Sequence, residues 1–207
     1  MALDNWLLYL AAVTLLSLTP GPNGLLALSH GARYGARHSC STILGGTVGF
    51  ILLMLLSLMG LGSLLLASES AFATLKLLGA GYLIYLGIRQ WRAAPLQLTA
   101  TAENTTGPSK RRRAAEGFSV AISNPKVILF FMAFLPQFID TQQPLLGQFL
   151  ILASTFALVE FAVELLLAMS AVKILSWFNH RRGMQLFNRL TGGLFIGAGT
   201  WLAIGQH

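Results

Sequence analysis

Hydrophobic residues fall in long blocks along the chain, and short polar stretches separate them. The blocks are solid runs of Leu, Ile, Ala, Phe and Gly, without the apolar–polar alternation of a membrane β-barrel. A bilayer core about 30 Å thick needs roughly 20 consecutive apolar residues as helix. The pattern therefore predicts about six transmembrane helices. They are expected at Trp6–Leu28, Ser39–Ala67, Phe72–Ile88, Phe118–Phe138, Leu145–Leu175 and Leu186–Ile204.

Composition supports an all-α integral membrane protein whose first partner is the lipid bilayer. The chain is 55% hydrophobic and only 10% charged, whereas soluble domains carry roughly 25% charged residues. Cys40 is the only cysteine, which excludes a disulfide framework and a cysteine-based metal cluster. We therefore expect no cofactor and no metal. The net charge of +7 lies in short loops between apolar blocks, so nucleic acid is not an expected partner.

A polar segment divides the chain into two units. Residues 93–115 are predicted to form a flexible basic cytoplasmic loop, which includes four consecutive cations from Lys110 to Arg113. Residues 1–92 and 116–207 then form two units of three helices each. Nearly all of the 14 Lys and Arg residues lie in the first, third and fifth loops, and cytoplasmic loops carry an excess of such residues. Both termini are therefore predicted to lie outside the cytoplasm.

Three helices per unit mean that the second unit enters the membrane from the opposite side. If the units are related, this is an inverted repeat, a common transporter architecture. The third span opens with KLLGAGYLI from Lys76, and the sixth opens with RLTGGLFI from Arg189. A cation, a Leu, a Gly and an aromatic residue fall in register. Chance similarity between glycine-rich helices is the alternative interpretation.

Proline predicts a break in the first and fourth helices. TPGPN begins at Thr19, and SNPK begins at Ser123. Proline removes a backbone donor and clashes with the preceding turn, and the freed groups must be satisfied by protein or by cavity water. Pro125 alone would be interpreted as a simple kink. Paired breaks in corresponding helices instead indicate a binding site near the repeat interface.

Three charged residues lie within the apolar blocks: Lys126, Glu160 and Glu164. Charges inside a bilayer are costly and usually face a cavity or a partner. The two glutamates are one helical turn apart and share a face, so at least one should be protonated at neutral pH. Such a pair suits proton coupling. The alternatives are a lysine that extends to the headgroups and a protonated glutamate bonded to a neighbouring helix.

The sequence resembles the lysine-exporter superfamily, and within it the homoserine/threonine-exporter branch. The similarity covers essentially the whole chain. Its motifs are TPGPN from Thr19, KLLGAGYLIYLG from Lys76, NPK from Asn124, FLPQF from Phe134 and NRLTG from Asn188. The resemblance implies a secondary transporter in the prokaryotic inner membrane. It would export amino acids or close derivatives of the homoserine, threonine and neutral class, in exchange for protons.

An amino-acid substrate carries a carboxylate and an ammonium, and broken helices offer partners for both. The predicted substrate-binding residues are Thr19, Pro20, Gly21, Pro22, Asn23, Asn124, Pro125 and Lys126. The predicted proton-coupling residues are Glu160 and Glu164.

Other functions fit the sequence less well. A passive small-solute channel has little need of Glu160 and Glu164, and a small-ion exporter would need ligands that the blocks lack. An intramembrane enzyme would need a His or a paired Asp inside a span, so no enzymatic activity is expected. The GxxxG pairs at Gly45 and Gly193 favour close packing within one subunit, and a homodimer interface is the alternative.

Overall fold

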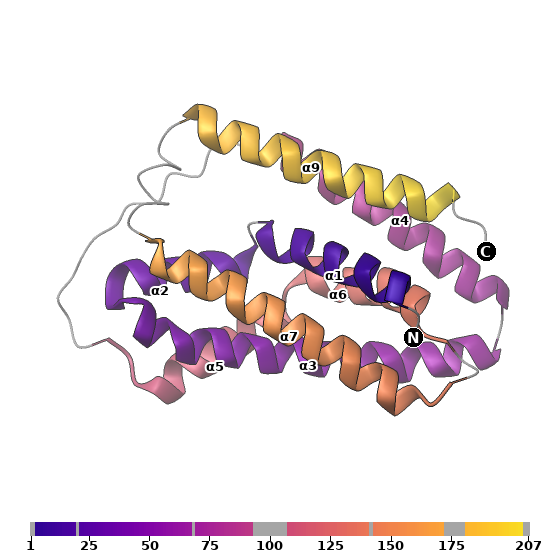
Figure 1. The fold of residues 1–207 in the computed structure, drawn as a ribbon, viewed down its shortest axis with the longest axis horizontal. Helices are drawn as coiled ribbons and strands as arrows, with labels where there is room; N and C mark the ends of the chain where they lie inside the picture. The colour runs from indigo at the N-terminus through magenta and orange to yellow at the C-terminus, as the bar shows by residue number, and fades with distance from the viewer. Residues whose placement is uncertain are drawn as a thin grey trace.

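The structure is a computed structural model that describes residues 3–19, 21–67, 69–92, 107–140, 143–171 and 181–204. These residues form helices and turns, and no strand occurs among them, so the all-helical prediction is confirmed. The elements are α1 (Leu3–Leu18), α2 (Pro22–Tyr34), α3 (Ala36–Ala67), α4 (Glu69–Trp91), α5 (Lys110–Ile122), α6 (Pro125–Phe134), the short 3-10 helix η1 (Leu135–Phe138), α7 (Leu145–Met169) and α9 (Arg181–Ile204), as Figure 1 shows.

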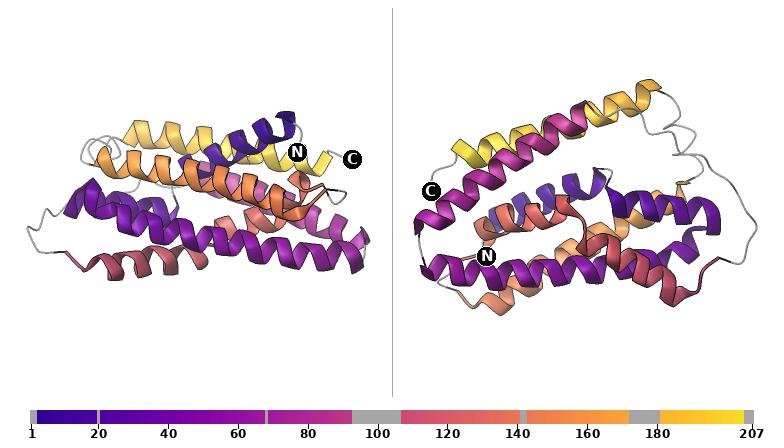
Figure 2. Two further views of the ribbon diagram at one scale, coloured as in Figure 1. Left: turned by 60° about the horizontal axis from the view of Figure 1, so that its bottom comes forward. Right: turned by 180° about the vertical axis from the view of Figure 1, so that it is seen from behind.

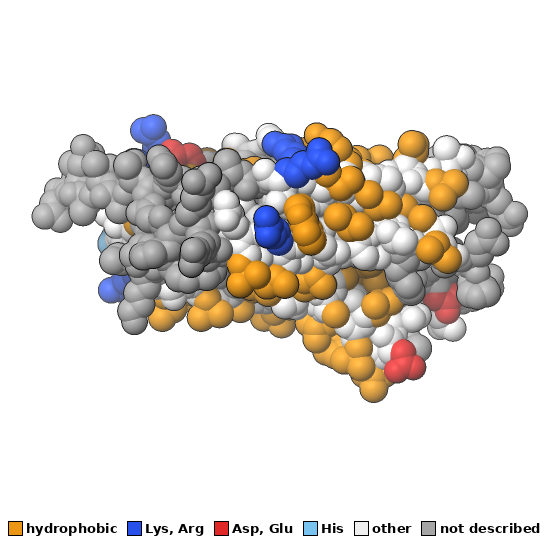
Figure 3. Space-filling model, turned by 90° about the horizontal axis from the view of Figure 1, so that it is seen from above, with side chains coloured by type: hydrophobic (Ala, Val, Ile, Leu, Met, Phe, Trp, Pro, Cys, Tyr) orange, Lys and Arg blue, Asp and Glu red, His pale blue; other side chains and the backbone are white. Residues whose placement is uncertain are grey.

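Two helices of the described ranges are long and apolar enough to cross a membrane, at Ala36–Gly60 and Leu145–Met169. A third span results if α1 and α2, which are bent by 56° relative to each other, are counted together. Leu158 and Leu166 project from α7 with 72% and 62% of their surface exposed. Figure 3 shows hydrophobic side chains over much of one face. Exposed apolar faces of this kind suit contact with lipid; the number of six spans stays a prediction.

Both predicted helix breaks are present. The chain leaves helical geometry between Leu18 and Pro22, and again between Ile122 and Pro125. Pro22 and Pro125 are the first residues of α2 and α6, where the missing N–H would be unpaired in any case. The Asn124 side chain caps α6 by accepting a hydrogen bond from the Lys126 backbone N–H at 3.1 Å. The pairs α1–α2 and α5–α6 run in opposite directions along the bundle (Figures 1 and 2).

The predicted loop over 93–115 was wrong at its C-terminal end. Helix α5 begins at Lys110, so the four cations are helical, and residues 93–106 lie outside the described residues. Ser109 caps this helix by accepting a hydrogen bond from the Arg112 backbone N–H at 3.3 Å. Arg113 is buried; its guanidinium donates to Ser41 Oγ on α3 at 3.2 Å and to the Pro108 carbonyl. Arg and Lys are good helix formers, so their polarity did not indicate an absence of structure.

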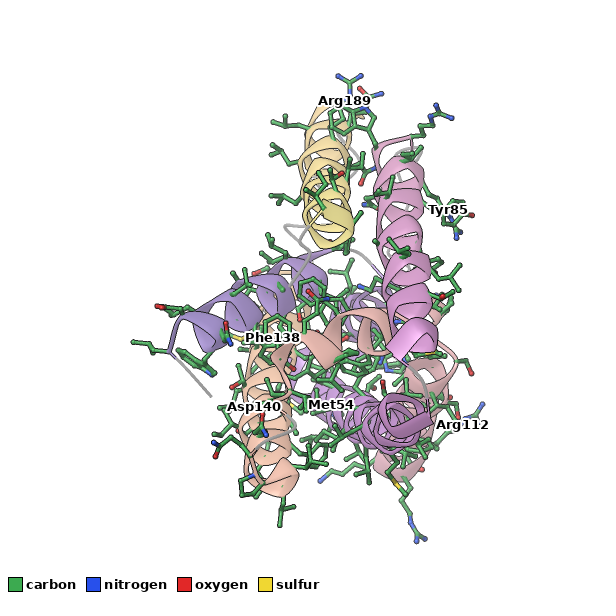
Figure 4. All side chains as sticks on the ribbon, turned by 90° about the vertical axis from the view of Figure 1, so that its right-hand side faces the viewer. Met54, Tyr85, Arg112, Phe138, Asp140 and Arg189 are labelled. Atoms are coloured by element: carbon green, nitrogen blue, oxygen red, sulfur yellow. The ribbon has the colours of Figure 1, made fainter. Side chains whose placement is uncertain are left out.

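Glycines bring two helix pairs into backbone contact. A Cβ at Gly45 on α3 would lie 2.0 Å from the Ala114 carbonyl oxygen on α5. A Cβ at Gly87 on α4 would lie 2.6 Å from the Gly192 carbonyl oxygen on α9. The Gly45 motif therefore packs within the subunit, as expected; a homodimer stays untested. Figure 4 shows α4 and α9 as a pair beside the main bundle.

An aromatic core fixes α6 between α1, α3 and α7. Phe131 on α6 packs edge to face on Phe156 of α7, with ring centroids 5.0 Å apart, and Phe156 packs on Phe50 of α3 at 5.6 Å. At the other end, Tyr9 of α1 contacts Phe138, which lies inside the bundle in Figure 4. Such pairs stabilise a core by about 0.5–1.5 kcal/mol each beyond burial. This core holds the helix break before α6 at a fixed place relative to α1.

The two ends of the bundle differ in sequence character. The α2–α3 turn and the starts of α5 and α9 lie together at one end in Figure 1. The N-terminal end of α1 and the C-terminal end of α9 lie at the other. The sequence of the first end includes Arg33, Arg37 and the cations at 110–113.

Candidate functional site

Lys126 reaches from α6 across to the C-terminal end of α1. Its Nζ donates hydrogen bonds to the Leu16 carbonyl at 3.0 Å and to the Thr19 carbonyl at 2.9 Å. The last carbonyls of a helix have no partner within that helix, and a helix C-terminus carries partial negative charge. Lys126, from the second half of the chain, therefore supplies hydrogen-bond donors to these carbonyls and a basic group to the C-terminal end of α1.

Glu160 and Glu164 lie on the buried face of α7, with only 6% and 2% of their surface exposed. Ser17, in the last turn of α1, donates a hydrogen bond to Glu160 Oε2. The two carboxyl groups are within hydrogen-bonding reach of each other, and both interact electrostatically with Lys126. Glu164 Oε1 is buried without a hydrogen-bond partner. With a protonated lysine, these three groups are electrically neutral when the carboxyl pair holds one proton.

One cavity of about 280 Å³ lies where the two helix breaks meet. This volume is just below the roughly 300–1,000 Å³ typical of ligand pockets, which fits a small solute. The lining residues are Thr19, Gly21 and Pro22 from the first break, Asn124, Pro125 and Lys126 from the second, Tyr82, Arg89 and Gln90 from α4, and Phe195 from α9.

The structure thus brings together all the predicted substrate-binding residues except Pro20 and Asn23. Pro20 lies outside the described residues. Asn23 is buried on the other side of α2, where its Nδ2 donates to the Gly117 carbonyl at 3.4 Å. A Cβ at Gly46 on α3 would lie 2.5 Å from the same nitrogen. Asn23 therefore contacts α3 and α5 and does not line the cavity.

Sequence reasoning missed the contribution of α4 and α9 to this cavity. The third predicted span ended at Ile88, one residue before Arg89, but Arg89 lies in the last turn of α4. Tyr82 and Arg89 are seven residues apart, so they share one face of the helix. That spacing was the available signal. Gln90, beside them, donates from Nε2 to Asn188 Oδ1 on α9 at 3.0 Å, which ties the lining to the α4–α9 pair.

The cavity is lined by two basic side chains, Arg89 and Lys126, and by no acidic residue. The carboxyl groups of Glu160 and Glu164 are not part of the lining but interact with Lys126. The planar Arg fork suits bidentate recognition of a carboxylate. Freed carbonyls at the end of α1 suit an ammonium. The arrangement can therefore hold a small molecule that carries both groups.

Comparison with known protein families identifies the family of this chain. Residues 14–206 match the family described as LysE type translocator. The chain belongs to this family. It is therefore a membrane transporter and not an enzyme, which confirms the resemblance seen in the motifs.

Named relatives of this translocator align over nearly the whole chain. The homoserine/homoserine lactone efflux protein of Salmonella typhi is 38% identical over 207 residues, all of both chains. An uncharacterized membrane protein of Vibrio cholerae is 34% identical over 204 residues, 98% of each chain. The leucine efflux protein of Salmonella choleraesuis is 31% identical over 203 residues, 96% of this chain and 94% of the relative. No solved structure matches.

Proposed function

We propose that this translocator exports amino acids or close derivatives, of the homoserine, threonine and neutral class, from the bacterial cytoplasm across the inner membrane in exchange for protons. One observation carries the proposal: a small cavity unites both helix breaks with two cations, and a buried carboxyl pair lies next to Lys126. The names of the relatives, which include efflux proteins for homoserine, homoserine lactone and leucine, support this substrate class.

In the proposed pose, each part of an amino acid has a partner in the cavity lining or next to it. The substrate carboxylate binds the Arg89 guanidinium in the lining. The substrate ammonium binds the carbonyl of Thr19, also in the lining, and the carbonyl of Leu16, which is buried beside it. The side chain lies against Tyr82 and Phe195, which supply the aromatic part of the lining. Such a pose uses charge-assisted hydrogen bonds, which contribute roughly 1.5–3 kcal/mol each.

The buried carboxyl pair favours antiport over the other functions. A passive channel for a neutral solute has no use for Glu160 and Glu164 at a buried position, since buried charge is costly. A cation exporter is disfavoured because Arg89 and Lys126 give the cavity positive charge, which repels a metal ion.

We also propose six spans in two inverted units, with both termini outside the cytoplasm. Support comes from helix direction: α3 runs opposite to α7, and α4 runs opposite to α9 (Figure 1). Basic segments gather at the end of the bundle away from both termini, as the excess of Lys and Arg in cytoplasmic loops requires.

Cysteine labelling tests the orientation. In a Cys40→Ser background, Gln143→Cys should react with an impermeant maleimide added to intact cells, and Arg111→Cys should react only after the cells are opened. Both positions are exposed, so access depends on the side of the membrane. The reverse pattern would overturn the orientation.

Transport by purified protein tests the function. In proteoliposomes with an imposed pH gradient, labelled homoserine, threonine or leucine should accumulate on the acidic side, against its own gradient. Collapse of the pH gradient by an ionophore should abolish accumulation. Equilibration without accumulation would identify a passive pore, and transport of none of these amino acids would refute the substrate class.

Arg89 provides the matched variant for this assay. Arg89→Gln should raise the KM for the transported amino acid about tenfold or more, because one charge-assisted hydrogen bond is lost. Arg92→Gln, one position beyond α4 and off the cavity lining, is the control and should behave as wild type. Equal KM values for Arg89→Gln and wild type would remove Arg89 from the site.

A further inference from the structure

The ammonium of Lys126 already occupies the position that the proposed function gives to the substrate ammonium. Its two hydrogen bonds, to Leu16 O at 3.0 Å and Thr19 O at 2.9 Å, are those an amino-acid ammonium would make. The space is tight, since a Cβ at Gly21 would lie 2.9 Å from Lys126 Nζ. Two ammonium groups on the same carbonyls would repel each other strongly in a buried site. Lys126 must therefore leave before a substrate ammonium can bind there.

The carboxyl groups of Glu160 and Glu164 on α7 interact electrostatically with Lys126 and are its alternative partners. Ser17, which neighbours Leu16 on α1, donates to Glu160, so the carbonyls and the carboxyl pair are adjacent. Glu164 Oε1 is a buried acceptor without a partner, which an ammonium could satisfy. Among the described residues, the charged groups that act on either carboxyl are the other carboxyl and Lys126. Arg89 faces the same cavity from α4.

We infer that Lys126 is a built-in competitor of the substrate and couples substrate binding to proton release. This inference rests on the proposed function. Without substrate, Lys126 binds the α1 carbonyls, and Glu160 and Glu164 share one proton. When the substrate ammonium takes the carbonyls, Lys126 moves onto the carboxyl pair, and the shared proton leaves from a carboxyl O–H to water in the cavity.

Charge is conserved in this step. Before binding, the lysine is balanced by one carboxylate, and Arg89 carries one unbalanced positive charge, which the departing proton accounts for when the neutral substrate binds. After binding, the substrate ammonium and the lysine are balanced by two carboxylates, while the substrate carboxylate is balanced by Arg89. No bond other than the carboxyl O–H breaks, and one proton leaves for each substrate bound. The carrier cannot hold the substrate and the proton together, which is the condition for antiport.

Proton release on binding tests this directly. Homoserine is titrated into purified protein by calorimetry in buffers of different ionisation enthalpy, which yields the number of protons released per bound molecule. Wild type should release about one proton. Lys126→Gln should bind homoserine at least as tightly, because the competitor is gone, and should release about none. Wild-type proton release from Lys126→Gln, or loss of binding by folded Lys126→Gln, would overturn the inference.

A second variant retains Lys126 and changes only its position. Gly21→Ala should displace the flexible end of Lys126 from the carbonyls, so that part of the proton is already lost before substrate binds. Fewer protons should then be released per bound homoserine, whatever the affinity; unchanged release would contradict the inference. Gly24→Ala, whose Cβ would make an ordinary 3.5 Å contact with Leu167, is the control. If wild type binds none of homoserine, threonine and leucine, the proposed function fails instead.

Discussion

Replacement of Glu160 by Gln is expected to abolish proton-driven accumulation of substrate and to spare substrate exchange at equal pH. Glutamine keeps the shape of the side chain and can still accept the hydrogen bond from Ser17. With Gln at this position, Lys126 and Glu164 balance each other without a proton. Transport of the substrate is then no longer accompanied by binding and release of a proton. The ratio of substrate concentrations across the membrane should therefore fall to about 1, the value of passive equilibration.

The measurement uses proteoliposomes with an imposed pH gradient for accumulation, and counterflow at equal pH for exchange. Glu164→Gln should give the same result if the two carboxyl groups titrate as a unit. Glu116→Gln is the matched control, because Glu116 is a half-buried carboxylate off the cavity lining, 3.2 Å from Arg112 and 3.7 Å from His30. Should both single variants and the double variant still accumulate substrate, the pair is structural and protons act elsewhere.

Gly117→Ala should strongly destabilise the protein. A Cβ at this position would lie 2.0 Å from the Thr42 carbonyl oxygen and 3.1 Å from the Gly46 backbone nitrogen. Both are backbone atoms of α3, so no side chain can move aside, and α5 must separate from α3. Overpacking costs about 1–3 kcal/mol and occasionally more. A cost of about 3 kcal/mol lowers Tm by roughly 6–12 °C in a chain of this size.

Thermal unfolding of purified protein, followed by the loss of monodisperse material, measures this effect. Gly197→Ala is the control, since nothing lies within 4 Å of a Cβ at Gly197. Alanine is a better helix former than glycine, so this variant should be at least as stable as wild type. A Gly117→Ala protein as stable as the Gly197→Ala control would show that α3 and α5 are not in backbone contact.

Local chemistry made much of the fold and the site predictable. The apolar blocks indicate transmembrane helices because bilayer thickness sets the length of an apolar run. Pro22 and Pro125 indicate helix breaks because proline lacks a donor wherever it occurs. Glu160, Glu164 and Lys126 are conspicuous because charge inside an apolar block needs a partner. Each of these inferences depends only on a residue and its neighbours in the chain.

Where the structure of a segment depends on contacts with distant parts of the chain, the sequence misled or gave no signal. Residues 110–113 seemed to belong to a loop because they are polar, yet Ser109 caps a helix there and the Arg113 side chain is buried against α3. Their structure depends on a partner helix far away in the chain. Polarity indicates solvent contact only when no such partner exists.

The sequence by itself determined which residues could carry chemistry; the tertiary structure decided which of them meet. The lysine on α6 and the Leu16 carbonyl that it binds are 110 residues apart, and no periodicity relates them. The packing of α4 places Arg89 on the cavity lining, whereas the packing of α2 places Asn23 against α5 and off the lining. Helix faces and breaks follow from local sequence, whereas the register between helices follows from packing across the whole bundle.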